Sequence, residues 1–458
     1  MDRSSPPPSP PSFEDLDAAL RWLDDHIDFE ANMPRRRALP TLDRMRALTS
    51  LLGEPQDSIP SIHVTGTNGK GSTSAMITML LMAKGLSVGT YTSPNLHRVS
   101  ERLARNGEPI DDEAFTSVLQ ELALLETLLP ESERPTRFEL LTAAALSWFA
   151  TEPVDAMVIE VGLGGTWDCT NVVRADVAVL TNVSYDHTDV LGPTLEGIAA
   201  DKAGIIEPGS RVVLGELTPE LAGIVFDRAE QVGAASLWRA GQDFGLESNR
   251  VAVGGRLVTI WTPGGRYEDL LVPLHGAHQG RNAAVAVAAA EAFFGDALDP
   301  EVVEDAMAAV RVPGRLEVLG RHPLLVMDGA HNAAGMAALG EALREEFAVA
   351  GNSVAVVGML SGRDPSAMLA PLADAGVRAV VACRPESPRA MPVSEVADAA
   401  RALGFTVHAE SDVRDALRLA RSLVDADGLV VVAGSLYVVG AARADALAAA
   451  VPWEDAGR

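Results

Sequence analysis

Two hydrophobic patterns alternate along this chain from Ser61 onward. Short runs of β-branched and other apolar residues, typical of buried strands, are followed by longer Ala- and Leu-rich segments in which apolar residues recur at helical spacing. Alternation of this kind indicates a mostly parallel α/β sheet. The strands predicted in the first series are 61–65, 86–92, 153–162 and 175–183, and the predicted helices are 71–85, 138–150, 194–203, 218–231, 278–294 and 299–310.

The pattern changes in two places. Glycine pairs at 254–255 and 264–265 divide the stretch 250–272, which predicts antiparallel hairpins. The helical pattern then stops near Pro313, and a second series of alternations follows. The strands predicted in the second series are 324–328, 353–358, 377–383, 405–409 and 428–434, each separated from the next by an amphipathic helix.

These patterns predict an α/β protein with two domains. The N-terminal domain, 13–312, is expected to hold a P-loop-type, mostly parallel sheet flanked by helices, together with a small antiparallel β subdomain. The C-terminal domain, 313–458, is expected to be doubly wound and Rossmann-like, and it has the length of an ordinary domain. Residues 1–12 are rich in Pro and Ser and are predicted to form a disordered tail.

Composition narrows the class of protein further. Hydrophobic residues make up 47% of the 458 and charged residues 22%, and no window reaches the roughly 18 uninterrupted apolar residues of a membrane span, so a globular protein is expected. The N-terminal segment lacks the apolar core of a secretory signal, and Cys169 and Cys383 have no metal-ligand spacing, which favours a cytoplasmic location. The net charge of −26, with no basic block, argues against nucleic-acid binding.

A glycine-rich turn, GTNGKGS at 66–72, joins the first predicted strand to the first predicted helix. In that setting backbone N–H groups and the helix N-terminus can hold phosphate oxygens, with the Lys70 ammonium against the β- and γ-phosphates. Lysine is rare here, occurring only as Lys70, Lys84 and Lys202, which suggests that the ammonium is needed where it is used. The turn departs from the general P-loop pattern in its glycine spacing and in Gly71, and alone it is equally consistent with an ordinary turn.

The string GTNGKGS resembles the one carried by folylpolyglutamate and dihydrofolate synthases and, with small changes, by the Mur ligases of peptidoglycan synthesis. The similarity continues, at the spacing of that family, from about Leu51 to Tyr437. The other matching segments are YTSPNL (91–96), EVGLGG (160–165), NVSYDH (182–187), DKAGI (201–205), HQGRNA (278–283), PGR (313–315), DGAHN (328–332) and GSLY (434–437). Asn95 is a departure, because the family has His at that position, and the segment TWDCTN (166–171) matches only in part.

The resemblance implies a role for each segment. The residues implied to bind ATP are Thr67, Asn68, Gly69, Lys70, Gly71, Ser72, Gln279, Asn282, Arg315 and Asp328. The residues implied to bind magnesium are Ser93, Glu160 and His187. Lys202 is implied to be carbamylated by CO₂ and to become an oxygen donor near the metal, while His331 and Ser435 are implied to lie beside the incoming glutamate. The expected catalytic residues are therefore Lys70, Lys202, Asp328 and His331.

Membership of such a family would make the chain an ATP-dependent amide ligase. The implied reaction uses ATP and two Mg²⁺ ions to convert a folate carboxylate into an acyl phosphate, which the amine of L-glutamate then attacks. The expected substrates are a folate or dihydropteroate, L-glutamate and ATP, and the family is generally monomeric. The sequence leaves open which pterin is accepted and how long a glutamate chain is built. The site is expected in a cleft between the two domains.

The residues alone leave plainer roles open. Glu160 could be a salt-bridged strand end, and a lone histidine such as His187 is more often a hydrogen-bonded structural residue than a ligand. Lys202 could be a solvent-exposed helix residue, and Asn332 could serve as the N-cap of a helix over 333–345.

Three rival functions remain at this point. A Mur-type cell-wall ligase would normally carry an extra N-terminal domain, and the roughly 60 residues before the P-loop are too few for one. A P-loop kinase or ATPase would leave Asp328 and His331 without a role. A nucleotide-dependent interaction protein would bind ATP without glutamate-dependent turnover.

Overall fold

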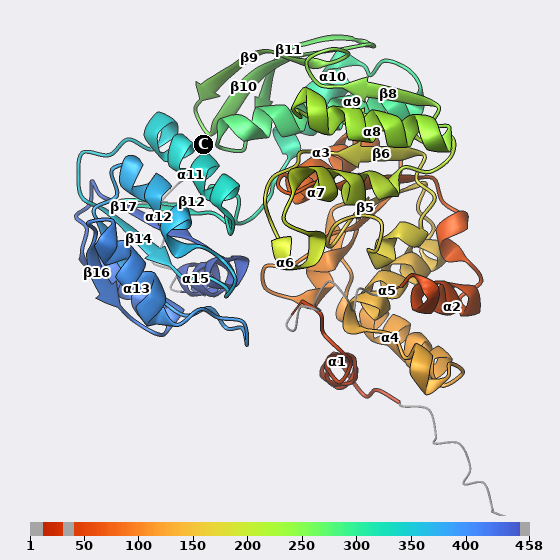
Figure 1. Cartoon of the computed structure of the whole chain (residues 1–458), viewed down its shortest axis with the longest axis horizontal. Helices are drawn as coiled ribbons and strands as arrows, with labels where there is room; N and C mark the ends of the chain where they lie inside the picture. The colour runs from red at the N-terminus through yellow and green to blue at the C-terminus, as the bar shows by residue number, and fades with distance from the viewer. Residues whose placement is uncertain (1–11, 31–40, 449–458) are drawn as a thin grey trace, which may run out of the picture.

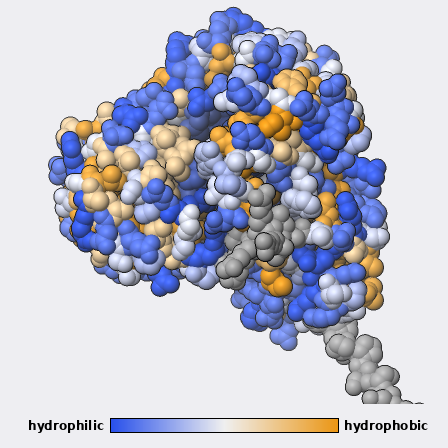
Figure 2. All heavy atoms as spheres, viewed as in Figure 1, coloured by the Kyte–Doolittle hydropathy of each residue, from blue (hydrophilic) through white to orange (hydrophobic). Residues whose placement is uncertain are grey.

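The computed structural model describes residues 12–30 and 41–448, so the tail predicted at 1–12 lies almost wholly outside the described residues. The described chain forms two larger sheets, each covered by helices, and one small antiparallel sheet (Figure 1). The N-terminal half runs from red to green in Figure 1, and the C-terminal half, in cyan and blue, lies beside it. In the space-filling view, hydrophilic residues cover most of the visible face and hydrophobic residues occur there in small groups (Figure 2).

The N-terminal sheet has eight strands in the order β4-β3-β2-β5-β1-β6-β7-β8. Its parallel strands are β1 (Ser61–Thr65), β2 (Val88–Tyr91), β5 (Ala156–Glu160), β6 (Val177–Leu180), β7 (Arg211–Leu214) and β8 (Ser236–Arg239), and its antiparallel edge is formed by β3 (Leu103–Arg105) and β4 (Glu108–Pro109). Every residue of β1, β5 and β6 is buried. Burial on both faces explains why these strands are continuous apolar runs in the sequence.

Helices cover both faces of this sheet. The face that carries Ile62, Val158 and Val179 packs against α3 (Lys70–Ala83), α9 (Ala277–Phe294) and α10 (Pro300–Ala309). The opposite face, with Met157 and Ile159, packs against α1 (Leu16–Asp24), α2 (Asp43–Leu51), α4 (Asp112–Glu126) and α5 (Arg137–Thr151). The remaining helices of this half are α6 (Thr188–Leu191), α7 (Leu195–Lys202) and α8 (Pro219–Val232).

The small sheet consists of β9 (Gly245–Ala252), β10 (Gly255–Thr262) and β11 (Gly265–Val272), paired antiparallel in the order β11-β10-β9. It confirms the predicted hairpins. Gly254 has a φ of +83°, which favours glycine at the first turn. The first strand starts at 245 rather than 250.

The C-terminal sheet has six strands in the order β12-β13-β17-β14-β15-β16. The strands are β12 (Glu317–Arg321), β13 (Leu324–Met327), β14 (Ser353–Val357), β15 (Ala379–Ala382), β16 (Thr406–Ala409) and β17 (Leu429–Ala433), and only β12 runs antiparallel. The helices α11 (Ala333–Glu346), α12 (Pro365–Asp374) and α13 (Val393–Ala402) cover one face, while α14 (Val413–Ser422) and α15 (Leu436–Ala448) cover the other. The doubly wound prediction is therefore confirmed.

The predicted strands and helices are present, but several elements were not predicted. They are α1, α2, α4, α6, β3, β4, β7, β8 and β12. Among them, β3 and β4 have three and two residues and lie at a sheet edge, so they carry no readable period. Some predicted strands are longer than the observed ones, as for 153–162 against β5, because apolar residues continue into the adjoining turns. Among the described helices, none is long and apolar enough to span a membrane.

Candidate active site

One cavity of about 380 Å³ lies where the two halves meet. The loops after β1, β2, β5 and β6 line it from the N-terminal half, and the loops after β13 and β17 line it from the C-terminal half. Parallel sheets place ligands at the carboxyl ends of their strands, so both halves present that edge to the same space. All residues predicted from the sequence to bind ATP, metal or substrate or to act in catalysis line this cavity, namely Thr67, Asn68, Gly69, Lys70, Gly71, Ser72, Ser93, Glu160, His187, Lys202, Gln279, Asn282, Arg315, Asp328, His331 and Ser435.

The glycine-rich turn between β1 and α3 is held in a shape that only glycine permits at Gly66. Its φ is +148°, and a Cβ there would lie 1.8 Å from the Thr181 Oγ1. The turn is also tied to the end of β6, because the backbone N–H groups of Thr67 and Asn68 donate to the backbone and side-chain oxygens of Asn182, both at 3.0 Å. The free N-terminus of α3 therefore points into the cavity from a fixed turn, which is a favourable place for phosphate oxygens.

Two lysines lie against this turn. The Lys70 Nζ donates to the carbonyl oxygen of Gly66 at 3.3 Å, and the Lys202 Nζ donates to the same oxygen at 2.9 Å. Lys202 is 3% exposed, so the plain role of a solvated helix lysine is wrong. Burial, together with the charge of Lys70, lowers the pKa of Lys202 to about 7.

Glu160 ends β5 with a buried carboxylate. The Ser93 backbone N–H donates to its Oε2 at 3.3 Å, and a Cβ built at Gly71 would lie 3.5 Å from the same oxygen. Glu160 therefore lies against both the loop after β2 and the first turn of α3. Burial raises the pKa of this carboxyl, against the opposing effect of Lys70. No ion pair of Glu160 occurs among the described residues, so the alternative of a salt-bridged strand end is not supported.

His187 follows β6 with its backbone in the left-handed region, at a φ of +48°. Burial lowers the pKa of its imidazole to about 3, so the ring is neutral at ordinary pH. A neutral ring keeps a lone pair for a metal or a hydrogen bond. The neighbouring Asp186 lies 3.6 Å from the Nε2 of His187. Burial opposes the ionisation of Asp186, but His187 and His331, when they are protonated, and the Arg363 guanidinium hold its pKa below the usual range.

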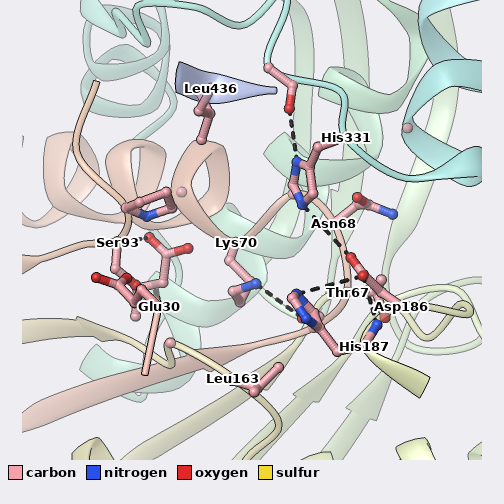
Figure 3. Close-up of a pocket in the computed structure, with 18 of the residues that line it drawn as sticks. Glu30, Thr67, Asn68, Lys70, Ser93, Leu163, Asp186, His187, His331 and Leu436 are labelled. Atoms are coloured by element: carbon pink, nitrogen blue, oxygen red, sulfur yellow. Dashed lines mark hydrogen bonds and ion pairs between the residues drawn. The ribbon is translucent and has the colours of Figure 1, made fainter. Parts of the chain in front are cut away.

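Three residues of the C-terminal half reach the cavity after β13 and β17. Asp328 is anchored by its own loop, since its carboxylate oxygens accept from the backbone N–H groups of Leu316 and Ala330, both at 2.8 Å. The Nδ1 of His331 donates to the carbonyl oxygen of Gly329 at 2.9 Å, which turns its Nε2 toward Asp186 (Figure 3). Ser435 is 2% exposed and begins the turn before α15.

The helix α9 packs its first turns against the glycine-rich turn. The Nε2 of Gln279 lies 3.4 Å from the Ser72 Oγ, and the Nδ2 of Asn282 donates to the Oε1 of Gln279 at 3.0 Å. A Cβ at Gly69 would lie 2.6 Å from the Oδ1 of Asn282. In this structure the two amides therefore support the turn directly.

Sequence reasoning missed part of the site. Asp186 lay within a recognised motif but was given no role, and Asn332 was considered only as a helix cap. Arg363, Arg389 and Trp167 were not considered for the cavity, which they line or border. The signal for Arg363 and Arg389 was weak, because each follows a buried strand by several residues and no matched motif includes them.

The donors at this site suit Mg²⁺ without forming a closed cage. No group of three or more His, Cys, Asp or Glu side chains within residues 12–30 and 41–448 is placed to hold a metal ion. Mg²⁺ usually keeps several waters and binds one or two carboxylates together with substrate phosphates. Glu160 and the Ser93 hydroxyl provide hard oxygen donors next to the glycine-rich turn, so the fit is to a metal that arrives with a nucleotide.

Comparison with known proteins shows the family. The model of the Mur ligase middle domain matches residues 64–290, and that of the Mur ligase glutamate ligase domain matches residues 314–436. Over 445 residues the chain is 39% identical to the dihydrofolate synthase/folylpolyglutamate synthase of Mycobacterium tuberculosis, covering 90% of this chain and 91% of that protein. The chain belongs to the folylpolyglutamate/dihydrofolate synthase family.

Other relatives of this family agree in length and in fold. The folylpolyglutamate synthase of Lacticaseibacillus casei is 38% identical over 418 residues, covering 89% of this chain and 95% of that protein. The solved structure of Mycobacterium tuberculosis folylpolyglutamate synthase complexed with ADP has a TM-score of 0.88 at 37% identity, covering 94% of this chain and 97% of that one. The structure of E. coli FolC in complex with DHPP and ADP has a TM-score of 0.82 at 30% identity, covering 95% and 98%. The expected family and fold are thereby confirmed, and the rival non-ligase functions are not supported.

Proposed function

We propose that this protein joins L-glutamate to the carboxylate of a folate, using ATP and an acyl-phosphate intermediate. The observation that carries the proposal is the single cavity in which Lys70 and the glycine-rich turn of one half face His331 of the other. A carboxylate does not condense with an amine in water, because hydroxide is a poor leaving group. Phosphorylation provides the leaving group, and the two halves would supply the two partial reactions.

The first partial reaction depends on positive charge around the triphosphate. The backbone N–H groups of the turn, the N-terminus of α3 and the Lys70 ammonium would hold the β- and γ-phosphates. Arg315 would approach the same phosphates from the other half, since its guanidinium lies beside Gly329 in the cavity. The folate carboxylate then attacks the γ-phosphorus and the bond to the β-phosphate oxygen breaks. Positioning and charge neutralisation are the main contributions of the protein.

Magnesium would be held by Ser93 and Glu160 at one position and by His187 at a second. When bound, the metal supplies charge neutralisation at the phosphate oxygens. The imidazole of His187 is already neutral, so it could bind the metal without first losing a proton.

Lys202 is proposed to carry a carbamate. A neutral amine attacks CO₂ to form an N–C bond and releases one proton, so a pKa of about 7 makes the reactive form available at neutral pH. The product would exchange a buried positive charge for a negative one beside Lys70, which removes the repulsion between the two ammonium groups.

The second partial reaction belongs to the C-terminal half. His331 is neutral at ordinary pH because burial lowers its pKa, and its Nε2 faces the cavity. It would position the glutamate amine and accept its proton as the amide bond forms and phosphate leaves. Ser435 would contact the glutamate from the start of α15.

The proposal also covers the domain boundary, the pterin substrate, the oligomeric state and the location. The boundary is proposed at 312/313, between α10 and β12. The pterin substrate is a reduced folate, dihydropteroate or both. The enzyme acts as a monomer. A cytoplasmic location agrees with its two buried, unpaired cysteines, because the cytosol is reducing.

The experiment is phosphate release from ATP and Mg²⁺, measured with dihydropteroate or tetrahydrofolate, each with and without L-glutamate. Stoichiometric phosphate that requires both the pterin and glutamate is the expected result, and it identifies the pterin. Turnover that is indifferent to both would overturn the proposed function.

A further inference from the structure

Asn332 uses every hydrogen-bonding group of its side chain, and it does so across the junction of the two halves. Its Oδ1 caps α11 by accepting from the backbone N–H of Gly335 at 2.8 Å. Its Nδ2 donates to the Oδ2 of Asp186 at 2.8 Å and to the Oδ1 of Asn68 at 3.0 Å. The residue is 1% exposed. A carboxamide is the only side chain of this size that offers an acceptor for the cap and two donors for the partners.

The partners of Asn332 in the N-terminal half are fixed. Asn68 lies in the glycine-rich turn, and its backbone carbonyl accepts from the Asn182 Nδ2 and the Thr181 Oγ1 at 2.8 and 2.7 Å. Asp186 is 7% exposed and also pairs with Arg363 of the C-terminal half. Figure 3 shows Asn68 and Asp186 on the side of the cavity that His331 faces. Asn332 therefore joins α11 to the turn that would hold the triphosphate.

The other end of α11 is anchored independently. The Glu346 carboxylate pairs with Arg256 and His275, both at 2.8 Å, and accepts from the backbone N–H of Gly276 at 2.9 Å. In Figure 1 this end of the C-terminal half lies next to β10. None of these four residues lines the cavity. Since α11 packs into the C-terminal core, loss of the Asn332 contacts would let this core tilt about Glu346 and would move His331, which lies two residues before α11.

A small tilt of α11 would be enough to slow the reaction. With 14 residues, α11 is about 21 Å long. A tilt of about 3° at Glu346 would move the opposite end by about 1 Å, and a displacement of that size can slow a reaction by roughly 100-fold.

We infer that Asn332 is a positioning residue that holds His331 over the glycine-rich turn, and so couples the nucleotide-binding half to the glutamate-binding half. The role of His331 in this inference rests on the proposed function, but the hydrogen bonds by which Asn332 joins the two halves do not.

The test compares Asn332→Asp and Asn332→Ser with wild type, in steady-state kinetics for each substrate. Asp retains the cap and replaces the donors by a carboxylate facing Asp186, while Ser retains a shorter cap and introduces no charge. The matched control is Asp412→Asn, since Asp412 caps α14 through the N–H groups of Arg414 and Asp415 at 2.8 and 3.0 Å, away from the cavity.

The expected result is a fall in kcat/KM for glutamate of about 100-fold for N332D and about 10-fold for N332S, with the KM for ATP changed less than about threefold. The melting temperature of N332D should fall further than that of D412N, because a second carboxylate is buried beside Asp186, while that of N332S should fall less than that of N332D. Wild-type glutamate kinetics in both variants would overturn the inference, and so would an equal loss for ATP and glutamate that follows the melting temperature.

The contacts of Asn332 are also tested without catalysis, by hydrogen–deuterium exchange of the backbone N–H groups in the glycine-rich turn, with a non-hydrolysable ATP analogue and Mg²⁺. Exchange in this turn, which lies in the other half from Asn332, should be faster in N332D and N332S than in wild type and unchanged in D412N. If wild type shows no glutamate-dependent turnover, the proposed function fails, while the exchange result still decides whether Asn332 joins the two halves. Equal exchange in wild type and both Asn332 variants would then overturn the inference.

Discussion

The ammonium groups of Lys70 and Lys202 meet at one oxygen atom, the backbone carbonyl of Gly66, at 3.3 and 2.9 Å. Two ammonium groups that share one acceptor repel each other, and Lys202 is also buried. Both effects raise the free energy of the protonated state of Lys202. The site is therefore positively charged and suited to an anion. Because the pKa of Lys202 is lowered to about 7, this ammonium can lose its proton at neutral pH.

The first prediction concerns Lys202→Met and the free energy of unfolding. The pKa of Lys202 is about 7 in the folded protein against 10.5 unfolded, so between these values the unfolded state binds more protons and wild-type stability rises with pH. K202M lacks this dependence. It should therefore be more stable than wild type at pH 7 and below, and the difference should shrink as pH rises toward 10.

The measurement is thermal unfolding at several pH values in CO₂-free buffer, so that no carbamate forms. K202M should also lose ligase activity. A melting temperature below that of wild type at pH 6 to 7 would contradict the assigned burial cost of Lys202.

The contact between Asp186 and Asn332 shows where sequence reasoning stops. The strand and helix around the glycine-rich turn could be predicted because β1 is buried on both faces and α3 follows a glycine-rich stretch. The residues predicted to form the site line one cavity because each follows a parallel strand or starts a helix at the same edge of the sheet. Asp186 pairs with Asn332 and Arg363 at separations of 146 and 177 residues, which no local period encodes.

The second prediction concerns His331→Ala. Its ring faces the cavity from the C-terminal half, and among the described residues it forms no hydrogen bond or ion pair with the glycine-rich turn. The variant should therefore lose amide formation while it retains nucleotide binding. The kcat/KM for glutamate should fall by about 100-fold or more, a typical loss for a proton-transfer group. The Kd for ATP, measured by equilibrium binding, should stay within about threefold.

Hydroxylamine provides the control for H331A, because it reacts with an acyl phosphate without needing the glutamate site. Hydroxamate should still form from ATP and the pterin. Parallel losses of ATP affinity, hydroxamate and amide would show that His331 supports the whole cavity rather than the second partial reaction.

The third prediction concerns Glu160→Gln and magnesium. The amide keeps the size of the carboxylate but loses its charge, so the Mg²⁺ concentration for half-maximal activity should rise by about 10-fold or more. The matched control is Glu291→Gln, since Glu291 is also buried but bonds Thr262 and Tyr267 away from the cavity. An unchanged magnesium requirement in E160Q, or an equal shift in E291Q, would remove Glu160 from the metal site.

The fourth prediction separates two glycines that differ in what a methyl group would meet. At Gly66, alanine would place its Cβ 1.8 Å from the Thr181 Oγ1 in a left-handed backbone region, so G66A must distort the turn. A loss of at least about 2 kcal/mol in unfolding free energy is expected, together with loss of ATP binding. At Gly223, inside α8, a Cβ meets nothing within 4 Å, so G223A should gain about 0.5–1 kcal/mol.

Both variants are measured by denaturant unfolding and by equilibrium binding of ATP. G223A should bind ATP like wild type, because α8 does not line the cavity. If G66A retained both stability and ATP affinity, the turn could accommodate a side chain by moving away from Thr181. The glycine-rich turn would then not be the rigid support on which Lys70, Lys202 and Asn332 all depend.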